Sequence, residues 1–354
     1  MEQAATPLSP QPIIDCHSDV MIDVFRRRKQ GERQVLLRRH LPEYNAGGVV
    51  ASVCTMGGDG AALSPLGIEH PYESAVAKLE ALQADLAESE GKLAVVSSPA
   101  ELASCIEQGV YGIIPSIEGA SPVQGDLARI EEFYERGLRV LGLCWNEPNE
   151  LAVGTDSGVA DSGLTDVGAE AVALMNDLGI VIDLAHASKR TFMDVAGISR
   201  APLFVSHSNA KGVYEHVRNL DDEQIQAVVR SVGVVGLNFY GPFIGVSRAT
   251  VDHLLDHIDY LVSAMGAEGV VLGPDFIDFA LEELELEMAR HPGLYPPEVE
   301  YALGAETVRS IQSVVTGMRE RGLDADAIDR IARGNFLRLF EKTQSLATIP
   351  ATTD

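Results

Sequence analysis

Short apolar runs alternate with amphipathic segments along almost the whole chain. Eight runs rich in Val, Ile and Leu have the length of buried strands, and they cover residues 12–19, 48–55, 111–119, 139–146, 180–188, 202–209, 233–240 and 269–276. Four segments between them place apolar residues three and four positions apart and carry a glycine at or near their end, at 72–92, 125–137, 166–179 and 221–233. This spacing predicts amphipathic helices with glycine C-caps.

The order of these elements predicts the fold class. Strand and helix repeated eight times over about 250 residues or more is the pattern of an α/β fold, the (β/α)8 TIM barrel. A doubly wound open sheet is the alternative, but no glycine-rich phosphate-binding motif follows the first run. The chain has no mid-chain linker, fixed repeat or low-complexity tract, so we expect residues 1–354 to form a single domain.

The segment 278–301, after the eighth run, is longer than a plain barrel loop. It is acidic and is broken by prolines. A solvent-exposed excursion is the simplest interpretation. A lid or a homodimer contact is the alternative, because long loops in compact domains are often functional.

Composition excludes several classes of partner. A formal net charge of −25 argues against nucleic acid, because phosphate binding needs concentrated Lys and Arg. The first residues lack a basic region followed by an apolar one, and no apolar run approaches the roughly 18 residues of a membrane span. We therefore expect a soluble, cytoplasmic protein without membrane contact. The four cysteines, Cys16, Cys54, Cys105 and Cys144, form no C-x-x-C motif and are expected to be reduced and buried.

Polar side chains fall at the ends of the apolar runs. The reacting groups of barrel enzymes sit at the C-terminal ends of the strands. The residues concerned are His17 and Asp19 in the first run, Glu118 in the third, Trp145 and Asn146 in the fourth, His186 in the fifth, His207 in the sixth, Asn238 and Tyr240 in the seventh, and Asp275 in the eighth. His17 and Asp19 are two positions apart, so a strand directs both into the same space.

This convergence predicts a metal site. Three histidines, two aspartates and a glutamate at one end of a barrel would be costly to bury without partners or metals. A mixed imidazole and carboxylate set suits Zn²⁺ or a similar divalent ion. Six such groups exceed one tetrahedral site, so two ions bridged by a carboxylate fit better than one.

The other histidines have no such pattern. His40, His70, His253, His257 and His291 fall in predicted helices or loops, and we expect them at the surface. The surface assignment is weaker for His216, because Arg218 and Asn219 follow it just outside the sixth run. No G-x-S-x-G motif accompanies the histidines, so Ser206 is interpreted as a strand residue rather than a nucleophile.

The chain resembles the membrane, or renal, dipeptidases, which are metallopeptidases of the amidohydrolase superfamily. The resemblance spans nearly the whole chain and rests on several motifs in order: "DCHSDV" near the start, "SIEGA" from Ser116, "GLTDVGAEAVALMNDLGIVIDLAHAS" from Gly163, "FVSHSNA" from Phe204, "HVRN" from His216, "GPDF" from Gly273 and "GNFLRLF" from Gly334.

The resemblance implies a role for each matching residue. It implies that His17 and Asp19 bind one zinc ion, that His186 and His207 bind a second, and that Glu118 bridges the two. It further implies that Arg218 holds the substrate carboxylate and that Asp275 lies near the nucleophilic water. Glu118 and Asp275 are thus the catalytic candidates, while Trp145, Asn146 and Tyr240 are candidates for substrate binding beside Arg218.

Two positions depart from the family pattern. Trp145 stands where many members have a histidine that helps to stabilise the tetrahedral intermediate, and "GPDFID" lacks the glycine and acid that commonly follow "DF". The expected function is a zinc-dependent dipeptidase, with dipeptides that carry a D-residue at the C-terminal position among the candidate substrates. The alternatives are an amidohydrolase for another small amide or cyclic imide, and a catalytically silent metal-binding homologue.

Overall fold

A closed ring of parallel strands forms the centre of the computed structural model, which describes residues 9–59, 70–155, 158–245, 248–280 and 300–349. The eight strands of the ring are β1 (Ile13–Ser18), β2 (Val49–Gly58), β4 (Tyr111–Glu118), β5 (Val140–Gly142), β6 (Val181–Asp183), β7 (Phe204–Ser208), β8 (Val234–Leu237) and β9 (Val270–Leu272). Each pairs with the next, β2 pairs directly with β4, and β9 pairs with β1 to close the ring. The predicted (β/α)8 barrel is confirmed.

A ninth strand, β3 (Leu93–Val95), lies outside the ring and was not expected from the sequence. It pairs in parallel with the beginning of β4, where Leu93 faces Tyr111. β5 pairs only with Ser116 and Ile117 further along β4, so the first part of that edge is open to β3. Three residues are too few to show a periodicity, so only the tertiary pairing defines this strand.

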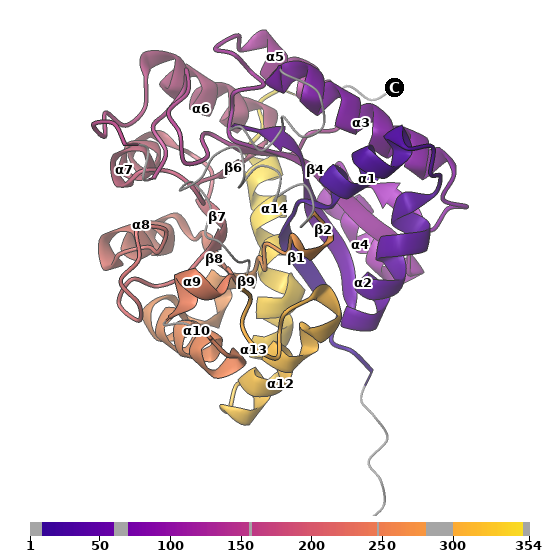
Figure 1. Cartoon of the computed structure of the whole chain (residues 1–354). Helices are drawn as coiled ribbons and strands as arrows, with labels where there is room; N and C mark the ends of the chain where they lie inside the picture. Colours follow the sequence, from indigo (N-terminus) through magenta and orange to yellow (C-terminus); the bar gives the residue numbers. More distant parts are fainter. Residues whose placement is uncertain (1–8, 60–69, 156–157, 246–247, 281–299, 350–354) are drawn as a thin grey trace, which may run out of the picture.

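The helices surround the ring (Figure 1). They are α1 (Val20–Lys29), α2 (Leu41–Gly47), α3 (Pro71–Ala87), α4 (Pro99–Gln108), α5 (Ala128–Glu135), α6 (Asp166–Leu178), α7 (Lys189–Ile198), α8 (Asp222–Ser231), α9 (Gly241–Ile244), α10 (Val251–Met265), α12 (Gln312–Glu320), α13 (Ala325–Asp329) and α14 (Asn335–Ser345). Two π-helical turns, Leu36–His40 and Arg330–Gly334, precede α2 and α14. Short 3-10 turns lie at Ala267–Gly269, Asp278–Ala280 and Val308–Ser310.

The predicted helices correspond to α3, α5, α6 and α8, but of these only α6 has the expected glycine at its C-cap, since Glu88 and Arg136 cap α3 and α5. At α6 the Thr165 side chain accepts a hydrogen bond from Gly168 N–H, and Gly179 ends the helix with φ +71°. At α8 the left-handed C-cap is Val232, with φ +58°, and not the neighbouring Gly233. Gly233 is instead required by space, because a Cβ there would lie 2.1 Å from the Leu203 carbonyl oxygen.

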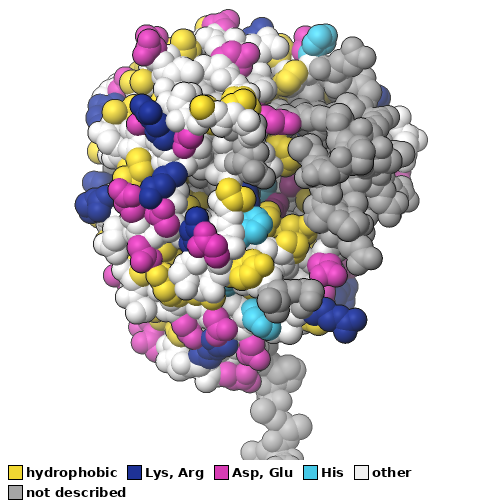
Figure 2. Space-filling view, turned by 60° about the vertical axis from the view of Figure 1, so that its left-hand side comes forward, with side chains coloured by type: hydrophobic (Ala, Val, Ile, Leu, Met, Phe, Trp, Pro, Cys, Tyr) yellow, Lys and Arg dark blue, Asp and Glu magenta, His cyan; other side chains and the backbone are white. Residues whose placement is uncertain are grey.

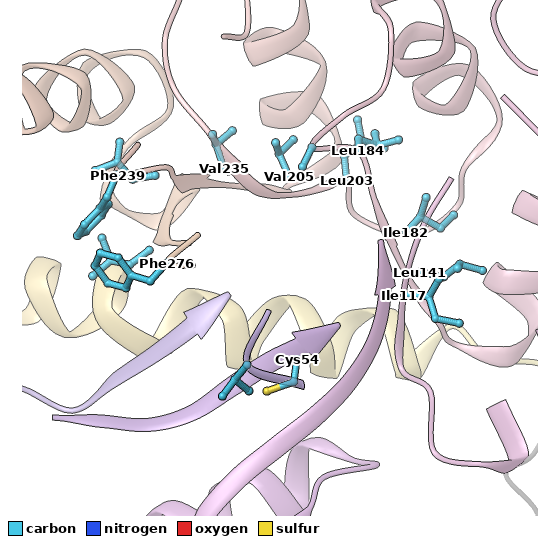
Figure 3. Close-up of a cluster of buried hydrophobic side chains, with 14 of the residues drawn as sticks. Cys54, Ile117, Leu141, Ile182, Leu184, Leu203, Val205, Val235, Phe239 and Phe276 are labelled. Carbon is cyan, nitrogen blue, oxygen red and sulfur yellow. The ribbon is translucent and has the colours of Figure 1, made fainter. Parts of the chain in front are cut away.

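Two apolar layers hold the barrel together. The first takes a residue from every strand of the ring and includes Phe336 and Phe340 of α14, a helix that lies behind the strands in the view of Figure 1. The second lies between the strands and the surrounding helices, and Figure 3 shows part of it around Ile117, Ile182 and Val235. Buried polar side chains also lie earlier in the strands, such as Ser52 of β2, whose Oγ contacts the hydroxyl of Tyr111 at the start of β4.

Several sequence-based expectations can be assessed at this level. All four cysteines are buried and free, as predicted. No helix in the described part of the chain is long and apolar enough to cross a membrane. On the face shown in Figure 2, Lys and Arg lie next to acidic side chains rather than in one basic patch. Most of the excursion at 278–301 lies outside the described residues, so its interpretation as a lid or dimer contact stays a prediction.

The expectation of surface histidines was wrong for two residues. His40 is buried, and its Nε2 lies 2.9 Å from Oδ2 of the buried Asp23. His257 is buried in α10, where its Nε2 donates to the Ile244 carbonyl oxygen at 2.8 Å and its Nδ1 accepts from Ala210 N–H at 3.1 Å. Their helices turn these side chains inward. His70 is exposed, His253 is half-buried, and His291 lies outside the described residues.

Candidate metal centre

The predicted ligands come together at the C-terminal end of the barrel from four strand ends. His17 lies near the end of β1, Glu118 is the last residue of β4, and His207 lies within β7. Asp19 and His186 follow the ends of β1 and β6 by one and three residues, so the loop geometry places them. Residues separated by more than a hundred positions therefore share one site.

Glu118 stands at the centre of the cluster. Its Oε1 lies 2.9 Å from His186 Nε2, 3.4 Å from His207 Nε2 and 3.5 Å from His17 Nε2. In a tetrahedral site with bonds of about 2.1 Å, neighbouring ligand atoms are about 3.4 Å apart. The separations to His17 and His207 match that geometry. A carboxylate oxygen that faces three ring nitrogens could hold a metal ion together with them.

His186 shows most directly that a cation fits here. Its Nδ1 lies 2.9 Å from Asn146 Oδ1, which is an acceptor, so Nδ1 carries the hydrogen and Nε2 presents a lone pair. That lone pair faces the Glu118 carboxylate and also His207 Nε2 at 2.9 Å. His207 Nδ1 contacts Ser206 Oγ at 2.8 Å, and this hydroxyl orients the ring as either donor or acceptor. A cation among these atoms would bind the His186 lone pair and the Glu118 carboxylate together.

His17 provides a second observation of the same kind. Its Nε2 is buried and has no hydrogen-bond partner among the described residues. Besides Glu118, Asp19 Oδ2 lies 3.6 Å away and Asp275 Oδ1 lies 3.7 Å away. Two sets with converging donor atoms can thus be drawn, one of His17, Glu118 and His207 and the other of His17, Asp19 and Asp275. The donors are nitrogen and oxygen only, as zinc and similar divalent ions prefer.

The pKa shifts in the cluster reflect crowded acids in a buried space. Burial, with repulsion from Asp19, raises the pKa of Glu118 to about 8 against the opposing effect of His17. Burial also raises the pKa of Asp275 to about 6. The pKa values of His186 and His207 are lowered well below the usual range by burial and by nearby positive charge. The positive groups of the protein do not offset the charge of these acids in the buried site. Divalent cations would favour the ionised acids and the neutral imidazoles.

Asp275 lies at the edge of the cluster in an uncommon backbone conformation. Its φ is +62°, in the left-handed region that non-glycine residues rarely adopt. Asn238 Nδ2 donates to its Oδ2 at 3.0 Å, while Oδ1 faces His17. The carboxylate is therefore held by one oxygen and directed at the metal site by the other.

Arg218 places a buried positive charge beside the same cluster. Its guanidinium donates to the Ala185 carbonyl oxygen, and its Nη2 lies 3.0 Å from His186 Nε2. Its Nε is buried without a hydrogen-bond partner among the described residues. Once His186 Nε2 binds a cation, the Nη2 group loses that acceptor. The guanidinium then has donors available for an anionic group in the site.

The remaining candidates line the rim of the site. The Trp145 ring lies 5.6 Å from the His186 ring, and its backbone N–H donates to Asp59 Oδ2 at 2.9 Å. Asn146 is hydrogen-bonded to His186, so it also orients a predicted ligand. Tyr240 is half-buried and packs against the Phe243 ring at 4.9 Å. All three predicted substrate-binding residues are thus close to the predicted ligands or to the adjoining loops.

Sequence reasoning missed three acidic side chains that organise the site. Asp15 Oδ1 accepts from His17 N–H at 3.0 Å. Asp183 Oδ1 accepts from Ser206 N–H at 2.9 Å and so holds the backbone directly before His207. Asp59 accepts from Ser121 N–H at 2.6 Å as well as from Trp145, and it joins the loops after β2, β4 and β5. Asp15 could have been found, because it lies two positions before His17.

The comparisons with known proteins agree with this arrangement. The sequence model of the membrane dipeptidase family, peptidase family M19, matches residues 1–294. An uncharacterised protein encoded in the pqqA 5′ region of Klebsiella pneumoniae is 30% identical over 274 residues, which cover 75% of this chain and 94% of that protein. An uncharacterised dipeptidase of Schizosaccharomyces pombe is 37% identical over 181 residues, which cover 49% of this chain and 44% of the yeast protein.

Solved structures extend the similarity to nearly the whole chain. A metallopeptidase from Rhodobacter sphaeroides, liganded with a phosphinate mimic of the dipeptide L-Ala-D-Ala, is 25% identical with a TM-score of 0.81 and covers 94% of this chain and 99% of its own. A metallopeptidase described as dipeptidase AC is 26% identical, also with a TM-score of 0.81, and covers 95% of this chain and 99% of its own. This chain accordingly belongs to the membrane dipeptidase family of metallopeptidases and is a hydrolase of peptide bonds.

Proposed function

We propose that this protein is a dipeptidase that works with two zinc ions. His17 and Asp19 would hold one ion, His186 and His207 the other, and Glu118 both. The observation that carries the proposal is the convergence of three imidazole nitrogens on Glu118 Oε1, at 2.9 to 3.5 Å. Five side chains with one bridging carboxylate exceed the four positions of a single tetrahedral site.

The ions would lower the pKa of a shared water and polarise the scissile carbonyl. The residues of the chain supply the remaining chemistry. Asp275, free at Oδ1 and held by Asn238 at Oδ2, accepts a proton as the water oxygen adds to the carbonyl carbon. It then returns that proton to the amine nitrogen as the C–N bond breaks. The left-handed backbone at Asp275 directs the carboxylate for both transfers.

Arg218 gives the site its preference for short substrates. We assign its guanidinium to the terminal carboxylate of the substrate, in a charge-assisted contact that is often bidentate. A carboxylate bound by Arg218 would lie beside His186, a predicted ligand, and this suits a substrate whose terminus is close to the scissile bond. The Rhodobacter sphaeroides relative was solved with a mimic of L-Ala-D-Ala. We therefore include dipeptides with a C-terminal D-residue among the substrates.

The test combines metal analysis with a substrate panel. We expect about two zinc ions per chain after loading with zinc and dialysis, and hydrolysis of L,L and L,D dipeptides but not of their N-acetylated tripeptide extensions. At most one bound ion in excess zinc would refute the bridged site. Turnover of neutral cyclic imides in preference to every dipeptide would instead favour the broader amidohydrolase assignment.

A further inference from the structure

Asp275 and Tyr301 are joined at the turn that follows β9. The Tyr301 hydroxyl donates to the Asp275 carbonyl oxygen at 2.6 Å. The same hydroxyl accepts from Ile277 N–H at 2.7 Å. One oxygen atom thus satisfies the backbone acceptor before Phe276 and the backbone donor after it. The acceptor belongs to Asp275, the residue whose φ is +62°.

The Tyr301 ring is fixed by its own packing. It is 9% exposed, and its centroid lies 5.1 Å from the Phe276 ring and 6.1 Å from the Tyr240 ring. Its two neighbours bond to the loop after β8: Ala302 N–H donates to the Phe239 carbonyl oxygen at 3.1 Å, and Gly241 N–H donates to that of Glu300 at 2.7 Å. The hydroxyl therefore belongs to a segment whose backbone is bonded to the loop after β8, whereas the turn that it contacts follows β9.

The backbone strain at Asp275 needs such an anchor. A left-handed conformation at a non-glycine residue persists only where the surroundings hold it. The Asn238 amide holds only the side chain, through Oδ2. Among the side chains of the described residues, Tyr301 is the one that bonds to the main chain on both sides of Phe276. Without the hydroxyl, two backbone groups in a half-buried turn lose their partner.

We propose that Tyr301 is a positioning residue for the dipeptidase reaction, and that its hydroxyl keeps the Asp275 carboxylate between His17 and Asn238. The inference rests on the proton-transfer role proposed for Asp275. Tyr301 touches neither the predicted ligands nor the predicted substrate groups through its hydroxyl. It acts through the geometry of the turn, where a misplacement of about 1 Å can cost as much as 100-fold in rate.

The test is Tyr301→Phe, which keeps the ring and removes the hydroxyl. We expect kcat to fall about 10-fold, with KM changed less than about 2-fold and with metal content unchanged. Tyr72→Phe is the matched control, because the Tyr72 hydroxyl bonds to Glu132 on α5, away from the site. This control should keep the native kcat.

A double variant separates positioning from general stability. In an Asp275→Asn background, Tyr301→Phe should cause almost no further loss of kcat, because both changes act on one group. If the two losses multiply, or if Tyr301→Phe keeps the native kcat while Asp275→Asn does not, the role of Tyr301 is overturned. If Asp275→Asn itself keeps full activity, the proposed mechanism fails instead.

A crystal structure of the variant gives a measurement that does not depend on turnover. We expect residue 275 to leave the left-handed region or its carboxylate to move away from Asn238. An unchanged turn would overturn the proposal. So would a Phe variant that fails to fold, since loss of the fold with the ring retained would assign the hydroxyl to stability.

Discussion

His186 Nε2 and His207 Nε2 lie 2.9 Å apart, and each also faces the same oxygen of Glu118. Hydrogen bonds to Asn146 and Ser206 occupy the opposite nitrogens of the two rings. Both rings are therefore oriented with Nε2 toward Glu118, and the acceptor Asn146 Oδ1 places the hydrogen of His186 on Nδ1.

Glu118→Gln should remove both ions together. The amide keeps the shape of the side chain but not the charge, and one oxygen of Glu118 faces all three histidines. Metal analysis after zinc loading should give far fewer than two ions per chain, and turnover should be lost with them. Glu132→Gln on α5 is the matched control and should bind metal normally. Native stoichiometry in Glu118→Gln would exclude a bridging role.

Asp275→Asn should keep the ions and lose most turnover. Its proposed role is proton transfer, and such a group commonly contributes about 100-fold or more to the rate. Asparagine can still bond to Asn238 but cannot accept a proton. The measurement is kcat together with zinc content. Loss of one ion along with activity would show that Asp275 is a ligand, in line with its approach to His17 at 3.7 Å.

Asp23→Asn should lower the stability of the fold in a pH-dependent manner. Burial alone would raise the pKa of Asp23, but His40, Arg27 and Arg26 outweigh it and lower that pKa to about 2. Because the folded-state pKa is depressed, this stabilisation is complete above the unfolded pKa of about 3.8 and is lost as the pH falls towards 2. The difference in unfolding free energy between native protein and variant should be about 2 kcal/mol at pH 7.

Denaturant unfolding at several pH values measures this difference. It should narrow below pH 4 and nearly vanish around pH 2, whereas the exposed Asp326→Asn should differ little from the native protein throughout. A difference that stays constant across this range would show that Asp23 contributes by packing rather than by charge.

The sequence predicted the barrel well because the ring strands are mostly apolar and seven of the eight predicted runs end with a polar or aromatic candidate group. His17, Glu118 and His207 could be placed for that reason, since a strand end fixes the direction of the side chain. The pairing of Asn146 with His186 could not be predicted, because it depends on loops that meet only in the folded barrel. The same holds for Tyr301, which comes back to Asp275 after a long excursion.

The burial of histidines outside the site could not be predicted from the sequence. His257 has a helical spacing from His253 and no metal-binding motif, and such residues are usually exposed. In the fold α10 turns His257 toward the Ile244 carbonyl oxygen, and two hydrogen bonds satisfy the ring. The sequence gives no sign of which face of a helix will meet a neighbouring loop, so burial of a single polar residue is decided by tertiary packing.

Arg218→Ala should distinguish a dipeptidase from a general amidohydrolase. The guanidinium is buried beside His186, with an Nε that lacks a partner among the described residues, and it has donors for a carboxylate once His186 binds a cation. Capping the C-terminus of a dipeptide as an amide removes the charged partner, so kcat/KM should fall about 10- to 100-fold in the native protein. Arg218→Ala should cause a similar loss with the free acid and almost no further loss with the amide, because both changes delete one interaction. Lys189→Ala, which removes an exposed cation paired with Asp221, should leave this discrimination intact. If free and amidated dipeptides are cleaved equally well by the native protein, or if the two losses multiply, Arg218 does not recognise the carboxylate and substrate length must be set by another part of the site.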